Sequence, residues 1–405
     1  MKLKITNLTY LLFATLLIAS CSSDDDNNIN KAKVEKSEFI ETYAEIASAN
    51  YADSYTTAVT MKTKIDAFIA DPSVTTLEEA RDAWLYARDY YGQTEAYREA
   101  NGPIDNDDLL GTEGQINAWP LDEGYIDYVF NTTGGVVQNG LIGDTTFNLT
   151  EANIVAKNEE GKDDNISTGW HAIEFLLWGQ DLNYDPITHT TDNYTVSGNR
   201  SFEDYTTEDF AERRKTYLQI VTNLLVKDLK DLNDTWQSNG SYRATFEALD
   251  EDVALANILN GIGFISNGEV ALERIDPAID EGQENEHSCF SDNTNQDMWA
   301  NVNGINNIIV GSYTSESGNV ISGTSLISLV NNENEEIASI LSTKASETVS
   351  KLNTLLGLGK NFDEIISEET LGSNGPAGQL SSALKAQGSA ISDAASALGI
   401  NITIN

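Results

Sequence analysis

The segment GWHAIE, residues 169–174, places a histidine and a glutamate where they could share one chemical task. His171 and Glu174 are three residues apart, so on a helix both side chains lie on one face, about 5–6 Å from each other. An imidazole and a carboxylate in this arrangement can bind one metal ion, as in the metal sites of helical bundles. Gly169 would let another segment of backbone approach closely.

The residues around this pair, WHAIEFLLW (170–178), are otherwise apolar, so the helix is expected to be buried. Burying an unpaired carboxylate costs several kcal/mol, and Glu174 therefore needs a partner. Two interpretations follow from the residues alone. The pair is either a metal or ion-pair site, or His171 is a hydrogen-bonded histidine of the core.

A second group of polar residues lies upstream, where the apolar stripe of a helix predicted over residues 76–99 continues into Arg88, Glu95 and Arg98. A core stripe that becomes charged indicates either an ion-pair network or a site. In the following segment, 101–129, acidic residues are interspersed with aromatic ones. Its acidic residues include Asp105, Asp122, Glu123 and Asp127, and its aromatic neighbours include Trp119, Tyr125 and Tyr128.

These carboxylates could complete a hard, oxygen-rich site with His171 and Glu174, suited to iron, manganese, calcium or zinc. The alternative is a surface loop held in place by its aromatic residues. His287 in NEHSCFSDNT is expected to be a loop residue, and no role is predicted for His189. The chain has no HExxH motif, no phosphate-binding glycine loop and no nucleophile elbow with a Ser/His/Asp arrangement.

Composition limits the classes of function. The chain has 405 residues, which favours two domains over one. Its 24 basic and 64 acidic residues give a net charge of −40, so nucleic acid is excluded as a partner. The two cysteines, Cys21 and Cys289, cannot form a disulfide framework if Cys21 is lipidated.

The N-terminus predicts export. Two lysines precede the short apolar run YLLFATLLIAS, which is too short for a permanent membrane span. The run ends in LIASC, similar to a bacterial lipobox, so residues 1–20 are expected to be a lipoprotein signal peptide and Cys21 the lipidated residue. An ordinary secretory signal is the alternative. Residues 21–35 then form a flexible acidic tether. The protein is expected to contact the membrane only through an N-terminal lipid anchor. The membrane is expected to be the outer membrane of the cell envelope, with the protein on either its periplasmic or its exposed face.

Hydrophobic periodicity predicts an all-α protein. Helices are expected over residues 37–68, 76–99, 207–236, 333–356 and 376–398, in addition to the segment around His171. Long polar loops separate them: 183–200 is the candidate linker, and 284–307 is expected to be a loop. The domains are therefore predicted at 36–185, which holds the HxxE pair, and at 200–405.

A faint internal echo links TEAYREANGPID (94–105) with GEVALERIDPAID (268–280). Both contain a glutamate, then an arginine, then a turn with Pro, Ile and Asp. In a chain of two helical halves this echo indicates two four-helix-bundle-like halves related by duplication.

GWHAIE also matches the GxHxxE motif of the imelysin-like family, whose members are classified as metallopeptidases and associated with iron uptake. YGQTEAYR, INAWPLDEGYIDYV, GIGFISNGEVALERI and FSDNTNQDMWANVNGINNIIVGSY resemble further family blocks, in the family's order, over residues 80–313. The resemblance implies two four-helix bundles with the site near their interface. It implies Gly169, His171 and Glu174 as signature residues, Glu95 and Asp122 as further metal ligands, and Arg98 with residues 290–294, including Ser291, Asp292 and Asn293, as lining of the cleft. Asp105, Trp119 and Glu123 are candidates for the same cleft.

Three hypotheses for function follow. In the first, a lipoprotein of the cell envelope binds a metal ion or a metal-bearing small ligand during iron uptake, with a divalent or trivalent metal such as iron or zinc and with other iron-uptake proteins as candidate partners. In the second, a zinc metallopeptidase uses the HxxE site, although neither a separate general base nor an oxyanion stabiliser is identifiable. In the third, the polar cluster only holds two bundles together.

Overall fold

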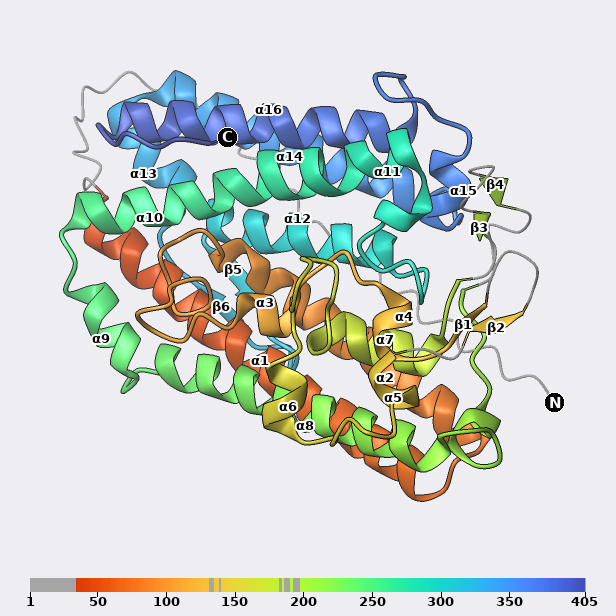
Figure 1. The fold of residues 1–405 in the computed structure, drawn as a ribbon. Coiled ribbons are helices and arrows are strands. Elements are labelled where there is room, and N and C mark those ends of the chain that lie inside the picture. Colours follow the sequence, from red (N-terminus) through yellow and green to blue (C-terminus); the bar gives the residue numbers. More distant parts are fainter. Residues whose placement is uncertain are drawn as a thin grey trace, which may run out of the picture. The chain divides into compact units, whose positions relative to one another are not determined.

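The computed structural model describes residues 34–130, 135–137, 140–181, 184–185, 190–191 and 197–404. Nearly all the regular structure in these residues is helical, which confirms the all-α prediction (Figure 1). The predicted signal peptide, Cys21, most of the tether and His189 lie outside the described residues. Within the described part of the chain, no helix has both the length and the apolar character needed to cross a bilayer.

Eight longer helices carry most of the core. They are α1 (Lys36–Ala70), α2 (Val74–Thr94), α7 (Gly169–Trp178), α8 (Ala211–Trp236), α10 (Glu251–Phe264), α12 (Thr294–Val310), α14 (Glu335–Leu356) and α16 (Pro376–Ala397). The shorter ones are α3 (Glu113–Ile116), α4 (Glu123–Ile126), α5 (Gly140–Gly143), α6 (Glu151–Val155), α9 (Ser241–Glu247), α11 (Asp276–Glu281), α13 (Leu326–Glu333) and α15 (Phe362–Ile366).

Other regular structure is sparse but includes one unusual element. The 3₁₀ turns are η1 (Glu95–Tyr97), η2 (Phe202–Tyr205) and η4 (Gln283–Asn285), and η3 (Ile265–Ile275) is a π-helix that joins α10 directly to α11. Three antiparallel two-stranded ribbons pair β1 (Val129–Phe130) with β2 (Val136–Val137), β3 (Tyr184–Asp185) with β4 (Thr190–Thr191), and β5 (Ser312–Thr314) with β6 (Val320–Ser322).

The start of α2 differs slightly from the sequence-based expectation. The sequence predicts a start at residue 76, but the cap is Ser73, whose Oγ accepts a hydrogen bond from the N–H of Thr76 at 3.3 Å. Thr76 Oγ1 in turn accepts from the N–H of Ser73 at 3.0 Å. A serine followed three residues later by a polar side chain satisfies two backbone donors reciprocally, so the helix begins two residues earlier than predicted.

Helices pack in two neighbourhoods of the unit formed by Val34–Asn405. α1 lies against α2 and α8, and α7 packs on α2 and α8; α16 lies against α14, α10 and η3 (Figure 1). α12 contacts both groups, because it packs on α2 and on α14. α8 follows the predicted linker in sequence yet packs on α1, and the domain boundary at 185–200 stays a prediction.

The crossing of α2 and α12 requires small residues. A Cβ added at Gly304 would lie 2.3 Å from the carbonyl oxygen of Gln93, and one at Gly92 would lie 2.7 Å from Cβ of Ala300. Only glycine permits backbones to approach this closely. The close crossing brings the C-terminal end of α2, with its charged residues, against the helix that carries Asp297.

The expectation that residues 284–307 form a loop is wrong for most of that range, because α12 begins at Thr294. Met298, Val302, Ile305 and Ile309 are buried at helical spacing. The many Asn and Asp residues concealed this pattern. Several of them, including Asp297 and Asn301, are themselves buried because they hydrogen-bond to arginines.

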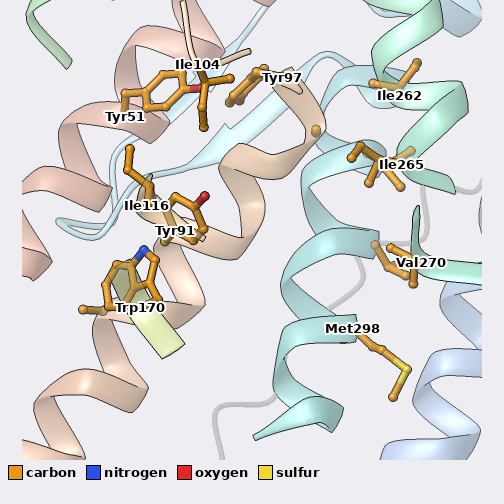
Figure 2. Packing of buried hydrophobic residues seen from close by; sticks show 14 of the residues in the cluster. Tyr51, Tyr91, Tyr97, Ile104, Ile116, Trp170, Ile262, Ile265, Val270 and Met298 are labelled. Atoms are coloured by element: carbon orange, nitrogen blue, oxygen red, sulfur yellow. The ribbon is translucent and has the colours of Figure 1, made fainter. Parts of the chain in front are cut away.

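A continuous apolar core joins the two groups of helices, and Figure 2 shows part of its packing. On one side Trp170 of α7 packs on Tyr91 of α2, with ring centroids 5.4 Å apart. On the other side Ile265 and Val270 of η3 and Met298 of α12 belong to the same buried cluster. Polar groups enclosed by this core have little access to water, so their partners within the protein determine their chemistry.

Candidate functional site

The helix α7 is fixed in place at its first residue. Gly169 has φ +84°, and a Cβ there would lie 2.4 Å from the carbonyl oxygen of Ile116. The preceding Thr168 donates a hydrogen bond from Oγ1 to the carbonyl of Gln115 at 2.9 Å. The predicted close approach at Gly169 is therefore present, and it positions the first turn of α7, which carries His171, beside the segment 115–120.

His171 and Glu174 face each other in a fully buried pair. His171 Nδ1 lies 2.9 Å from Glu174 Oε2, and neither residue is exposed to solvent. Ser291 donates two hydrogen bonds to the other oxygen, Oε1, from its N–H at 3.0 Å and from its hydroxyl at 2.7 Å. Both carboxylate oxygens are thus occupied. His171 Nε2 is buried and has no hydrogen-bond partner within the described residues.

Burial sets the protonation of this pair. It lowers the pKa of His171 well below its usual value, with further contributions from Arg88 and Arg274, so the imidazole is neutral. Burial also raises the pKa of Glu174 to about 8, although the hydrogen bonds from Ser291 oppose the shift. Near neutral pH the pair therefore holds one proton between Glu174 Oε2 and His171 Nδ1, and His171 Nε2 carries a second.

A buried arginine organises the neighbouring polar groups. Arg88 of α2, with no exposed surface, donates from Nε to Asp297 Oδ1 at 2.9 Å and from Nη1 to Asn117. Its Nη2 lies 3.2 Å from His287 Nε2. The guanidinium also lies over the rings of Tyr91 and Trp170, 5.2 and 5.8 Å from their centroids. The predicted charged end of the α2 stripe is therefore a buried ion-pair network.

His287 lies in a turn, as expected of a loop residue, but it is buried beside His171. It is 3% exposed, and its ring centroid lies 5.1 Å from that of His171. Arginine can only donate, so His287 Nε2 must accept from Arg88 and its proton must reside on Nδ1. This Nδ1–H has no hydrogen-bond partner within the described residues. In this arrangement His287 is a hydrogen-bond donor and not a metal ligand.

The two echoing segments meet in reciprocal ion pairs. Glu95 Oε2 accepts from Arg274 Nη2 at 2.6 Å, and Arg98 Nη1 lies 3.1 Å from Glu269 Oε1. The glutamate of each segment thus pairs with the arginine of the other, as expected for segments related by duplication. Arg274 also donates to its neighbour Glu269 at 2.5 Å, because a π-helix brings residues five apart side by side.

A polar cleft of about 390 Å³ opens above these residues. Both predicted halves line it: the first through Arg98, Glu113, Asn117, Trp119 and Glu159, the second through Glu269, Glu273, Arg274, Asn285 and His287. The ring of Trp119 lies 4.8 Å from that of His171. The rings of Trp119 and His287, which line the cleft, therefore adjoin the ring of His171, which is not itself among the lining residues.

Two of the predicted metal ligands, Glu95 and Asp122, lie in different environments. Glu95 is buried in its ion pair with Arg274, whereas Asp122 is half-buried at the start of α4, where its N–H donates to the carbonyl of Asp164 at 2.8 Å. His171, Glu174, Glu95 and Asp122 do not form one group of ligand atoms within the part of the chain that the structure describes.

The remaining candidates divide between the cleft and its surroundings. Arg98 and Trp119 line the cleft, and Ser291 binds Glu174. Asp105 accepts from the N–H of Glu99 at 2.8 Å beside Arg98. Glu123 is the first residue of α4, and Asn293 directly precedes α12 without a side-chain capping hydrogen bond. Asp292 lies in a separate acidic cluster, described below.

Asp127, another acidic residue of the 101–129 segment, forms ion pairs with two buried arginines. It accepts hydrogen bonds from Arg200 at 2.7 Å and from Arg214 at 2.6 and 3.0 Å. These arginines hold its pKa below the usual value despite its burial. Asp127 is therefore a buried, neutralised anchor between the loop and α8.

Replacing Glu269 with glutamine is expected to lower stability at neutral pH. Burial alone would favour its neutral form, but Arg274 and Arg98 outweigh burial and lower its pKa to about 2. A depressed carboxyl pKa stabilises the fold above the unfolded value near 4.5, and this contribution is lost as pH falls toward 2. Glu269→Gln should cost roughly 3 kcal/mol at pH 7 and almost nothing at pH 2.

Urea unfolding at a series of pH values measures this difference. Glu273→Gln is the matched control, because burial and Glu269 raise the pKa of Glu273, and its removal should not destabilise the protein at pH 7. An equal loss at pH 7 and pH 2 for Glu269→Gln would show that packing, and not charge, is responsible.

Comparison with known proteins supports one family. The Imelysin family model matches residues 47–387. A crystal structure from Parabacteroides distasonis ATCC 8503, of a protein proposed to be an iron-regulated protein A precursor, is similar with a TM-score of 0.67 and 19% identity, covering 91% of this chain and 96% of that one. An imelysin-like protein from Psychrobacter arcticum 273-4 has a TM-score of 0.59 and 15% identity, covering 92% and 99%. No curated protein matched the sequence. With the family model spanning most of the sequence and the GxHxxE motif at the start of α7, the chain belongs to the imelysin family.

Proposed function

We propose that this imelysin-family protein binds a metal-bearing small ligand in the cleft, with His171 as the residue that holds the metal. One observation carries the proposal. His171 Nε2 is buried without a hydrogen-bond partner in the described structure, and the ring of His171 adjoins those of the cleft-lining Trp119 and His287. An imidazole nitrogen in such a position is costly unless a ligand uses it.

The surroundings of His171 fit a metal ligand. Metal-bound histidines commonly donate their second ring nitrogen to a carboxylate, which fixes the tautomer and orients the ring. Glu174 Oε2 is placed for this role at His171 Nδ1, and Ser291 holds the carboxylate from the other side. When bound, the metal would supply a Lewis-acidic centre that accepts the Nε2 lone pair.

The donor set favours a metal that brings ligands of its own. Glu174 has both oxygens engaged, and His287 Nε2 is held by Arg88. Glu95 is held by Arg274 through Oε2, and only its buried Oε1 has no hydrogen-bond partner among the described residues. One imidazole does not satisfy the three or four protein ligands that a bare ion such as zinc usually takes. The cleft, with charged and polar groups from both halves of the chain, offers donors and acceptors to the organic part of a chelate.

Metal binding at His171 Nε2 requires the His171–Glu174 pair to lose one proton. Loss of one proton from the pair leaves Glu174 as a carboxylate that accepts from His171 Nδ1–H and leaves Nε2 with a free lone pair. The two hydrogen bonds from Ser291 stabilise that carboxylate.

Iron is the metal we propose, and the cell envelope the location. The relative from Parabacteroides distasonis carries the name of an iron-regulated precursor. The lipobox-like LIASC and the acidic SSDDDNN that follows it support export and lipid anchoring at Cys21, in the outer membrane. Other iron-uptake proteins are the proposed partners.

Titrating the purified chain with ferric citrate, haemin and ZnSO₄ tests the function. Ferric citrate or haemin is expected to bind with one-to-one stoichiometry, followed by tryptophan fluorescence, since Trp119 lines the cleft. Bare Zn²⁺ should bind His171 more weakly. If neither iron compound binds, the proposed function is wrong; chelator-sensitive cleavage of an unfolded polypeptide would instead favour a peptidase.

Replacing Cys21 with serine is expected to abolish lipidation. In a bacterial host fed radiolabelled palmitate, the wild-type chain should carry the label and sediment with membranes, because acyl chains supply the membrane affinity. Cys21→Ser should carry none and remain in the soluble fraction. Cys289→Ser removes the other, buried cysteine and should leave labelling unchanged. Label on Cys21→Ser would contradict the anchor.

A further inference from the structure

A cluster of acidic side chains lies outside the lining of the cleft, and one of its members, Asp292, directly follows Ser291. Asp181 follows α7, Asp292 precedes α12 and Asp363 belongs to α15, and one carboxylate oxygen from each lies within 4.8 Å of the others. Glu286, 2% exposed, is close enough for all three to affect its charge. Four acidic groups from distant parts of the sequence are thus gathered in one place.

Three members of this cluster lack a cationic partner among the described residues. Across the described ranges, no lysine, arginine or histidine forms an ion pair with Asp292, Asp363 or Glu286. Burial and the neighbouring carboxylates raise the pKa of Asp292 to about 8 and that of Asp363 to about 7. Like charges this close repel one another strongly unless a proton or a cation lies between them.

The hydrogen bonds leave an excess of acceptors. Asp363 is 2% exposed, and neither of its carboxylate oxygens has a hydrogen-bond partner among the described residues. The N–H groups of Asp363 and Glu364 lie close enough to its carboxylate to lower its pKa, but burial and Asp181 raise the pKa by more. A buried carboxylate with both oxygens unsatisfied is costly.

A neutral side chain beside the cluster also lacks a hydrogen-bond donor for its oxygen. Gln283, 4% exposed, donates from Nε2 to Asp181 Oδ2 at 2.7 Å, which places its amide at the cluster. Its Oε1 is buried and likewise has no partner in the described structure. Asn361 donates to Asp292 Oδ2 at 2.6 Å. Buried oxygen atoms of Asp363 and Gln283 therefore lack donors among the described residues at the place where the carboxylates meet.

We infer that Asp181, Asp292 and Asp363, with Gln283 Oε1, form a calcium site. Calcium takes six to eight oxygen ligands from carboxylates, amides and water and tolerates irregular geometry, whereas zinc prefers nitrogen and sulfur. The inference goes beyond the proposed function and does not depend on it. Because Asp292 follows Ser291, a bound calcium ion would also fix the loop that holds Glu174.

Calorimetry and thermal melting of the full chain, stripped with EGTA and dialysed at pH 7.5, test the site. One Ca²⁺ per chain is expected to bind, and 10 mM CaCl₂ should raise the melting temperature by about 2–5 °C. The same concentration of MgCl₂ should have a smaller effect, because magnesium demands regular octahedral geometry.

Two variants make the test specific. Asp363→Asn keeps the side-chain volume, so it should weaken Ca²⁺ binding at least tenfold while melting in EGTA at the wild-type temperature or above, because repulsion is relieved. Asp393→Asn changes an exposed aspartate of α16 and should respond to Ca²⁺ as the wild type does. The absence of any calcium effect on the stripped wild type, or undiminished affinity in Asp363→Asn, would overturn the site. Neither outcome depends on whether the cleft binds an iron chelate.

Discussion

Replacing His171 with alanine is expected to weaken binding of the iron chelate at least about 100-fold. Loss of a residue that only orients a ligand typically costs 10- to 100-fold in metal affinity, and loss of the ligand itself should cost more. Fluorescence or calorimetric titration with ferric citrate or haemin, whichever binds the wild type, measures the change. His189→Ala removes a different imidazole, for which no role is predicted, and should leave the affinity unchanged.

Glu174→Gln tests the same site without opening a cavity. The glutamine oxygen can still accept from Ser291, but its NH₂ group would then donate to His171 Nδ1 and hold the imidazole with its proton on Nε2. That tautomer has no lone pair for a metal, so affinity should fall 10- to 100-fold. If both variants melt at lower temperature yet bind the chelate as tightly as the wild type, the pair is a structural element of the core.

Replacing Arg88 with methionine should be the most destabilising single change near the site. The side chain is fully buried, and its loss leaves the carboxylate of Asp297 without its cation and His287 Nε2 without a donor. Breaking a buried ion pair on one side costs about 3–5 kcal/mol, because an uncompensated charge remains in the interior. Urea unfolding monitored by circular dichroism measures the loss.

A surface pair provides the matched control for Arg88. Lys64 and Glu79 lie 3.0 Å apart with side chains 43% and 48% exposed, so Lys64→Met should cost at most about 1 kcal/mol. The double variant Arg88→Met/Asp297→Asn should be more stable than the sum of the single losses predicts, because the buried charge is removed as well. Similar small losses for Lys64→Met and Arg88→Met would contradict the proposed importance of the buried network.

The helical architecture was predictable because its signal is local. Repeated apolar residues marked α1, α8, α14 and α16 to within a few residues, and Ser73 shifted the start of α2 only slightly. The position of His171 and Glu174 on one buried face also followed from spacing alone. α12 was missed because its apolar residues are interspersed with asparagines, which are poor indicators of a buried helix.

The partners within the site were not predictable from spacing. His287 resembles a loop residue until the fold brings it to Arg88, 199 positions away. The echo of Glu95 and Arg98 in residues 268–280 was visible, but the reciprocal pairing with Arg274 and Glu269 depends on a π-helix, whose five-residue spacing no helical periodicity of 3.6 indicates. Likewise, Asp363 carries no sequence signal that connects it to Asp181.

The central claim is that His171 Nε2 holds the metal of a ligand in the cleft. Crystals soaked with the iron compound that binds in solution, measured on both sides of the iron absorption edge, test it most directly. The predicted result is an anomalous peak about 2.0–2.2 Å from His171 Nε2, with Nδ1 still bonded to Glu174. Iron bound elsewhere, with His171 Nε2 still unliganded, would contradict the account.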